Sequence, residues 1–229
     1  KNPWAARDDY IDVILDRSQE SIERYLARHR THALSADERS RILKLMELQR
    51  HALLMYTSCG WFFDDISGIE TIQILQYAGR TVQLGEELFG RDNIESDFLG
   101  ILQTAASNDP KIGNGRDLYM KFVRPAMIDG HKAVGHYAVS SLFQDYPEQS
   151  ELYSYIVDRE YSKMSTSGLN RLAVGRCRIK SKMTWDSSHV EYAVVHLGDH
   201  NISGGVRDCK DQNPAQESFR EMIRSFEKG

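Results

Sequence analysis

The residues best suited to chemistry are gathered in one short stretch, residues 56–70, which reads YTSCGWFFDDISGIE. There the consecutive aromatic residues Trp61, Phe62 and Phe63 precede the acids Asp64 and Asp65. The flanking patterns predict that this stretch is a turn between two helices. Such turns are usually short and polar, so three rings at this place require an explanation.

Two explanations are open. The first is a hydrophobic plug that closes one end of a helical bundle, with Asp64 or Asp65 beside the positive N-terminus of the next helix. The second is a sugar-binding wall, in which a ring stacks on the C–H face of a pyranose and the carboxylates accept hydrogen bonds from its hydroxyl groups. Composition alone favours the plug.

A complete catalytic pair is not expected in this stretch. Retaining hydrolysis of a glycosidic bond needs two carboxyl groups about 5–5.5 Å apart across a sugar. Asp64, Asp65 and Glu70 supply carboxyl groups, but adjacent aspartates usually point in different directions. We therefore assign no catalytic residue, and whether the chain belongs to an enzyme stays open.

No metal site or cofactor is expected either. His196 and His200 flank an aspartate, but their spacing does not match the helical zinc motif, so an exposed polar turn is the better interpretation. His131 and His136 are five residues apart, a poor spacing for one helix face. Cys59 lies near the C-terminal end of a predicted helix, where the dipole disfavours a thiolate, and we expect a buried structural thiol.

Composition restricts the class of protein. The chain has 229 residues, 41% hydrophobic and 27% charged, which is ordinary for a globular protein that folds without metals or disulfides. The net charge is −4, with 29 basic residues dispersed among 33 acidic ones, which argues against nucleic acid as a partner. No apolar run approaches the ~18 residues of a membrane span. Three dispersed cysteines favour a reducing compartment, so we expect a cytoplasmic protein.

Helical patterns fill the first two thirds of the chain. Asn2 and Pro3 predict a helix start, and apolar residues recur at helical spacing until about His29. Ser35 and Glu38 predict a capping box and a second helix to about residue 59, closed by Gly60 in the left-handed conformation.

Three more helices follow by the same criteria. A third should start at Ser67, with a capping box to Glu70, and end at Gly90. A fourth spans roughly residues 93–106, and residues 107–115 form a loop. The fifth runs over residues 117–143, with a bend at Pro125.

The pattern changes after Pro147. Residues 176–183 alternate with period two, and residues 152–157, 190–197 and 201–207 also suggest strands of an antiparallel sheet with three or four strands. A last helix begins near Pro214, with Phe219 on its apolar face. The predicted fold class is α+β, mainly α: a helical bundle over residues 1–147, then a small antiparallel β region with a C-terminal helix over residues 148–229. Because the chain starts at Lys1 and stops within a helical pattern at Gly229, we expect a truncated fragment of a longer protein.

The motif MYTSCGWFFDDISGIE at residues 55–70, continuing as TIQILQYA to residue 78, resembles a family catalogued as a domain of unknown function, family 3536. That domain typically lies C-terminal to the catalytic domain of glycoside hydrolase family 57-like proteins, described as putative α-amylases or α-mannosidases. The opening NPWAARDDYI at residues 2–11 is similar to the same family's entry into its helical region.

The resemblance implies more than spacing can show. Family 57 enzymes act on α-linked glucans by a retaining mechanism, with both catalytic carboxyls on an incomplete β/α barrel and a helical bundle closing one side of the cleft. No barrel is present in this sequence, so the resemblance implies an upstream catalytic barrel of the same polypeptide and an α-linked oligosaccharide or polysaccharide as ligand. The substrate-binding candidates are then Trp61, Phe62, Asp64 and Asp65, with Tyr56, Glu70 and Arg7 as further contacts. The alternative is a non-catalytic structural or interaction module whose aromatic turn is a packing seam, either internal or against the barrel.

Overall fold

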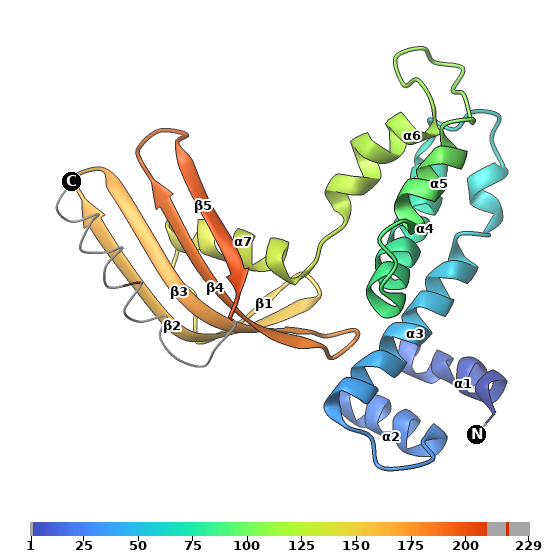
Figure 1. Ribbon diagram of the computed structural model, residues 1–229, viewed down its shortest axis with the longest axis horizontal. Helices are drawn as coiled ribbons and strands as arrows, with labels where there is room; N and C mark the ends of the chain where they lie inside the picture. Colours follow the sequence, from blue (N-terminus) through green and yellow to red (C-terminus); the bar gives the residue numbers. More distant parts are fainter. Residues whose placement is uncertain (1, 210–218, 220–229) are drawn as a thin grey trace. The chain divides into compact units, whose positions relative to one another are not determined.

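The computed structural model describes residues 2–209 and Phe219 (Figure 1). The class is α+β, with helices first in the chain and an antiparallel sheet after them, as predicted. Backbone contacts divide the chain into two compact units, residues 1–128 and 129–229. The sequence-based division fell at residue 147. The difference is helix α7 (Gly130–Ser141), which packs on the strands of the second unit.

The first unit begins with two helices where the pattern predicted one. Helix α1 spans Pro3–Leu15 and α2 spans Gln19–His29. The carboxylate of Asp16 accepts hydrogen bonds from the backbone N–H of Ser18 at 2.9 Å and from its hydroxyl group at 3.0 Å. Ser18 then caps α2 by accepting the N–H of Ser21. The single-helix prediction was wrong because these side chains take up backbone groups that a continuous helix would use.

Helix α3 spans Ala36–Leu54, and its predicted capping box between Ser35 and Glu38 is confirmed. A short 3₁₀ helix, η1, follows at Ser58–Trp61. The left-handed role predicted for Gly60 is wrong, because its φ is not positive. Gly60 is needed for close approach instead, since an added Cβ would lie 2.5 Å from Cγ1 of Ile74.

Helix α4 spans Ile69–Phe89 and runs beside α3 (Figure 1). The capping box predicted at Ser67 is wrong, because the N-cap is Gly68 and no side chain caps the helix. The backbone N–H of Ser67 donates instead to the carboxylate of Asp65, which fixes the chain before the helix begins. The predicted end at Gly90 is confirmed, with φ of 59°.

The rest of the first unit is a series of short helices. They are α5 (Ile94–Leu102), α6 (Gly115–Leu118), a π-helical turn η2 (Tyr119–Val123) and a 3₁₀ turn η3 (Arg124–Ala126). The predicted single helix over residues 117–143 is therefore wrong. Pro125 lacks an N–H, Met127 is extended, and the side chain of Asp129 starts α7 as a new helix.

Apolar side chains from these short helices pack on α4. The buried members of this core are Leu75, Leu99, Leu118, Tyr119 and Val123. Among the described residues, no helix combines the length and the apolar character that crossing a membrane requires.

The second unit is α7 and a five-stranded antiparallel sheet in which each strand pairs with the next along the chain. The strands are β1 (Gln149–Leu152), β2 (Tyr155–Ser167), β3 (Asn170–Ser181), β4 (Ser187–His196) and β5 (Ile202–Asp208). The sequence predicted three or four of them. The segment 152–157, predicted as one strand, contains the end of β1, the turn at residues 153–154 and only the start of β2, whose later side chains are mostly exposed and polar and weaken the alternation.

Helix α7 covers one face of this sheet (Figure 1). Its buried Tyr137 meets Tyr192 of β4 edge to face, with ring centroids 5.8 Å apart. Tyr192 in turn lies over Gly175 of β3, where an added Cβ would be 2.3 Å from the Tyr192 hydroxyl. The sheet therefore depends on a glycine at this position to admit the ring.

On another strand of the sheet, Tyr161 stacks on the buried Phe219, with centroids 5.9 Å apart and an interplanar angle of 3°. Leu172 and Val174 complete this cluster. The helix predicted from Pro214 onward lies outside the described residues apart from Phe219.

Candidate functional site

The aromatic turn predicted from the sequence lies between α3 and α4 and is open to solvent. Its rings are exposed by 76% at Tyr56, 74% at Trp61, 77% at Phe62 and 58% at Phe63. Phe62 and Phe63 contact each other edge to face, 5.3 Å between centroids. We call Tyr56, Trp61, Phe62, Phe63 and the exposed Asp64 the aromatic corner.

The plug interpretation is wrong for these rings, because they do not enter the core of the first unit. Ile66 takes that role, since it is partly buried against the core around Leu75 and Tyr119. Gly60, which belongs to the same turn as Ile66, lies against the side chain of Ile74 in α4. The inner side of the turn is thus filled by aliphatic contacts, and the rings remain outside.

Asp65 holds the corner to a second loop. Its carboxylate accepts hydrogen bonds from the backbone N–H of Ser67 at 2.8 Å, from the hydroxyl of Ser107 at 3.0 Å and from the backbone N–H of Asn108 at 2.5 Å. The hydrogen bonds from Ser67 and Asn108 lower the pKa of Asp65 to about 2. This carboxylate is already engaged, so it is a poor candidate for a sugar contact.

The remaining predicted residues have different surroundings. Glu70 is half-buried in the first turn of α4 and folds over Gly68, where an added Cβ would lie 2.8 Å from its carboxylate. Arg7 pairs with Asp8 at 2.6 Å and lies 4.9 Å from the ring of Trp4, so its contacts belong to α1. The structure therefore brings together Tyr56, Trp61, Phe62, Asp64 and Asp65 on one segment, and it gives Arg7 no contact with them among the described residues.

The cysteine and histidine predictions have mixed outcomes. Cys59 is exposed, so the buried thiol was a wrong prediction: η1 turns this residue outward once α3 has ended. His196 contacts the carbonyl of Asp199 at 3.0 Å in the hairpin between β4 and β5. His131 of α7 pairs with Asp208 of β5 at 2.9 Å. Within the described ranges no three His, Cys, Asp or Glu side chains are grouped as a metal site requires.

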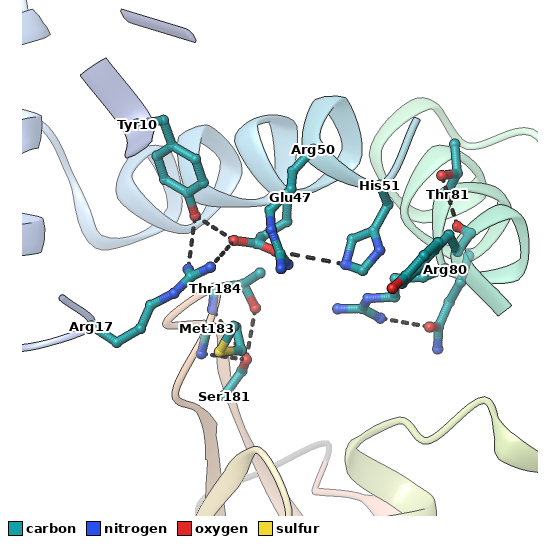
Figure 2. Close-up of polar contacts among 12 residues, drawn as sticks. Tyr10, Arg17, Glu47, Arg50, His51, Arg80, Thr81, Ser181, Met183 and Thr184 are labelled. Atoms are coloured by element: carbon teal, nitrogen blue, oxygen red, sulfur yellow. Dashed lines mark hydrogen bonds and ion pairs between the residues drawn. The ribbon is translucent and has the colours of Figure 1, made fainter. Parts of the chain in front are cut away.

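A second cluster, which the sequence did not reveal, surrounds the buried carboxylate of Glu47 (Figure 2). One oxygen accepts the hydroxyl of Tyr10 at 2.6 Å and faces Arg17 at 2.7 Å. The other oxygen lies 3.3 Å from Arg50 and 3.7 Å from Nε2 of His51. Arg17 also donates to the Tyr10 oxygen at 3.0 Å. We call these five residues the Glu47 cluster.

Two titratable groups of the cluster, Glu47 and His51, have pKa values below their ordinary ones. Burial raises the pKa of Glu47, but the hydrogen bond from Tyr10 and the charges of Arg17 and Arg50 outweigh it and lower the pKa overall. Burial lowers the pKa of His51 to about 4, and nearby arginines add to that effect. The only sequence signal was the spacing of Glu47, Arg50 and His51 at i, i+3 and i+4 on one face of α3.

A comparison with models of protein families shows the family to which the chain belongs. A model described as "Domain of unknown function (DUF3536)" matches residues 1–229. The chain belongs to the DUF3536 family. No curated protein and no solved structure was found to match it. The matched range includes the motif at residues 55–78.

Proposed function

We propose that this DUF3536 chain is the C-terminal accessory region of a glycoside hydrolase family 57-like carbohydrate-active enzyme. In this proposal the aromatic corner lines a sugar-binding cleft whose catalytic barrel precedes the chain in the same polypeptide. The supporting observation is the exposure of Tyr56, Trp61, Phe62 and Phe63 in a single short segment. Soluble proteins rarely keep such apolar surface open unless it binds something.

The chemistry of the corner suits an α-linked glucan. Exposed rings present flat faces on which the C–H side of a glucose unit stacks. The neighbouring exposed Asp64 offers carboxylate oxygens to sugar hydroxyl groups. Asp65 keeps the segment in place, so little conformational entropy is lost when a sugar binds. We retain Tyr56, Trp61, Phe62 and Asp64 as contacts, and we reassign Asp65 to positioning.

The corner itself supplies no matched pair of catalytic carboxyl groups. Asp65 is engaged by three donors, and Glu70 is folded over the backbone of Gly68. The proposal therefore places both reactive carboxyl groups on the barrel and leaves binding and orientation of the glucan to this chain.

A second candidate function is a protein interface, with the corner packing against another domain. The observation in its favour is that Leu53 and Ile69, which flank the corner in sequence, are also exposed. Aliphatic side chains contribute to protein interfaces but offer no flat face to a sugar ring.

Calorimetric titration of the 229-residue chain with maltoheptaose separates these functions. We expect saturable binding by the unmodified chain and an affinity about 5- to 150-fold weaker for Trp61→Ala, taking the about 1–3 kcal/mol of a base stacked on one aromatic ring as the scale for a stacked sugar. Phe89→Ala removes another exposed ring, at the far end of α4, and should bind normally. Absence of binding by the unmodified chain would favour the interface.

A further inference from the structure

Strand β5 forms one edge of the sheet, because within the described residues it pairs with β4 alone (Figure 1). The pairing has no register shift, and every residue of β5 except Val206 is exposed. Proteins usually protect an edge strand with charges, proline, a bulge or a short length. The opposite edge, β1, is short, with four residues. The segment ISGGV at residues 202–206 of β5 has none of these protections.

The backbone groups of Gly204 and Val206 point away from β4. At one end of the pairing, the N–H of Cys209 donates to the carbonyl of His189 at 2.8 Å. In an antiparallel pair, residues that bond to the neighbouring strand alternate with residues whose N–H and C=O groups face the other side. Counting back from Cys209 in steps of two, positions 207, 205 and 203 bond to β4. Gly204 and Val206 therefore present their donors and acceptors at the open edge.

Gly205, at the centre of β5, is a glycine that no contact within the described structure requires. Its φ is not positive, and an added Cβ would meet no atom within 4 Å. A glycine inside a strand packs no side chain and loses conformational entropy on folding, and it often marks a place where another backbone approaches closely. The position thus indicates a further strand beside β5.

We propose that β5 pairs antiparallel with β5 of a second copy of this chain, about a two-fold axis at Gly205. In this register Gly204 of one copy faces Val206 of the other, so the outward N–H and C=O groups of both residues exchange hydrogen bonds. The two Gly205 residues form the close pair at the axis, where Cα atoms lie about 4.5 Å apart. The two five-stranded sheets become one continuous sheet.

The charges at the end of β5 are compatible with this self-pairing. Arg207 of one copy faces Ser203 of the other, and Asp208 faces Ile202. Like charges directly opposite each other would destabilise the pair, and this register places none there. The same strand therefore serves as both partners without electrostatic conflict.

The apolar side chain of the second copy also has a place to go. A half-open cavity of about 440 Å³ lies between α7 and β5, with Ala138 and Val139 in its wall. Gly204 and Val206 are on the sheet face that α7 covers, since Val206 is opposite Tyr192, whose ring contacts that helix. Gly204 adds no side chain to the cavity wall, and Val206 of the second copy lies opposite it. This pairing thus removes apolar surface from water on both copies. It does not depend on the sugar-binding proposal.

The first test uses the unmodified 229-residue chain. Sedimentation equilibrium at several protein concentrations should show a reversible association of monomers into dimers. Amide hydrogen exchange should slow at Gly204 and Val206 as the dimer forms, because their N–H groups become bonded. The amides of Ser203 and Gly205, which already bond to β4, should change much less.

Two results of this test would overturn the proposal. The first is a chain that stays monomeric at millimolar concentration. The second is an exchange rate at Gly204 and Val206 that does not depend on concentration, since the edge would then be either open in the dimer or occupied by the same chain.

The second test places charges at the two-fold axis. Gly205→Lys and Gly205→Glu each bring two like charges together in the dimer and should weaken the association by about tenfold or more. An equimolar mixture of the two variants brings opposite charges together and should associate again, which also shows that both variants fold. The matched controls are Gly100→Lys and Gly100→Glu, at an exposed glycine of α5 where an added Cβ also meets no atom within 4 Å, and they should associate like the unmodified chain. A dimer that both Gly205 variants leave intact uses another surface and overturns the proposal.

Discussion

The hydroxyl group of Tyr10 in α1 donates a 2.6 Å hydrogen bond to the buried carboxylate of Glu47 in α3. This contact joins residues 37 positions apart, and Arg17, from the break between α1 and α2, approaches the same oxygen. The beginning of the chain is thereby fastened to the long helix that carries the aromatic corner at its far end. The contact has consequences for stability that can be measured.

Loss of the Glu47 charge should destabilise the fold strongly. Glu47→Gln leaves Arg17 and Arg50 without a counter-charge, which we expect to cost about 3–5 kcal/mol in the free energy of unfolding by urea. Tyr10→Phe removes one hydrogen bond to a charged acceptor and should cost about 1.5–3 kcal/mol. The control is Glu20→Gln on the exposed face of α2, with an expected change below about 0.5 kcal/mol. A Glu47→Gln chain as stable as the control would contradict the cluster.

Acid should destabilise the fold through His51. Its pKa is about 4 in the folded chain and 6.5 when unperturbed, so between these values the unfolded chain binds the extra proton. Stability from this group is complete above about pH 6.5 and is lost as the pH falls toward 4. The slope from one proton is at most about 1.4 kcal/mol per pH unit.

The measurement is urea unfolding at several pH values between 4 and 7 in a phosphate-free buffer. We expect His51→Gln to flatten the dependence, while His200→Gln, which removes a histidine from an exposed hairpin, keeps the slope of the unmodified chain. Identical slopes for both variants would refute a neutral, buried His51.

Asp64 and Asp65 are adjacent but should behave differently. Asp65→Ala removes the acceptor for Ser67, Ser107 and Asn108, so amide hydrogen exchange at Ser67 and Asn108 should become several-fold faster. Asp64→Ala should leave both amides protected. Because the pKa of Asp65 is lowered to about 2, its contribution is complete above about pH 4 and is lost as the pH falls through 2. Equal exchange in the two variants would remove the positioning role.

The sheet contains a steric test of its packing. Gly175→Ala places a methyl group 2.3 Å from the hydroxyl of the buried Tyr192, and we expect a loss of about 1–3 kcal/mol in unfolding free energy from overpacking. Gly205→Ala on β5 meets no atom within 4 Å and should change stability by less than about 0.5 kcal/mol. Comparable losses in the two variants would argue against the Tyr192 placement.

Local signals in the sequence predicted much of the fold. The helix start at Asn2, the capping box at Ser35 and the helix end at Gly90 are confirmed, because each depends on side chains within a few residues. The strand pattern after residue 147 is also confirmed in outline. The break at Asp16 and the end of the helix near Pro125 were missed, since apolar spacing continues across both.

Features that depend on distant contacts could not be predicted. The sequence identified the aromatic segment and not its exposure, which is decided by Ile66 and Gly60 filling the inner side of the turn. The role of Asp65 depends on a loop 42 residues away. The Glu47 cluster requires α1 and α3 to meet, and no local pattern in either helix indicates this.

The central claim, that the aromatic corner contacts an α-linked glucan, is tested most directly by NMR of the tryptophan indole N–H groups. The chain has three tryptophans, and single Trp→Phe variants at positions 4, 61 and 185 assign their signals. The account predicts that titration with maltoheptaose shifts the Trp61 signal to saturation and leaves those of Trp4 and Trp185 in place. A Trp61 signal that stays fixed at millimolar sugar, or three signals that move alike, would contradict it.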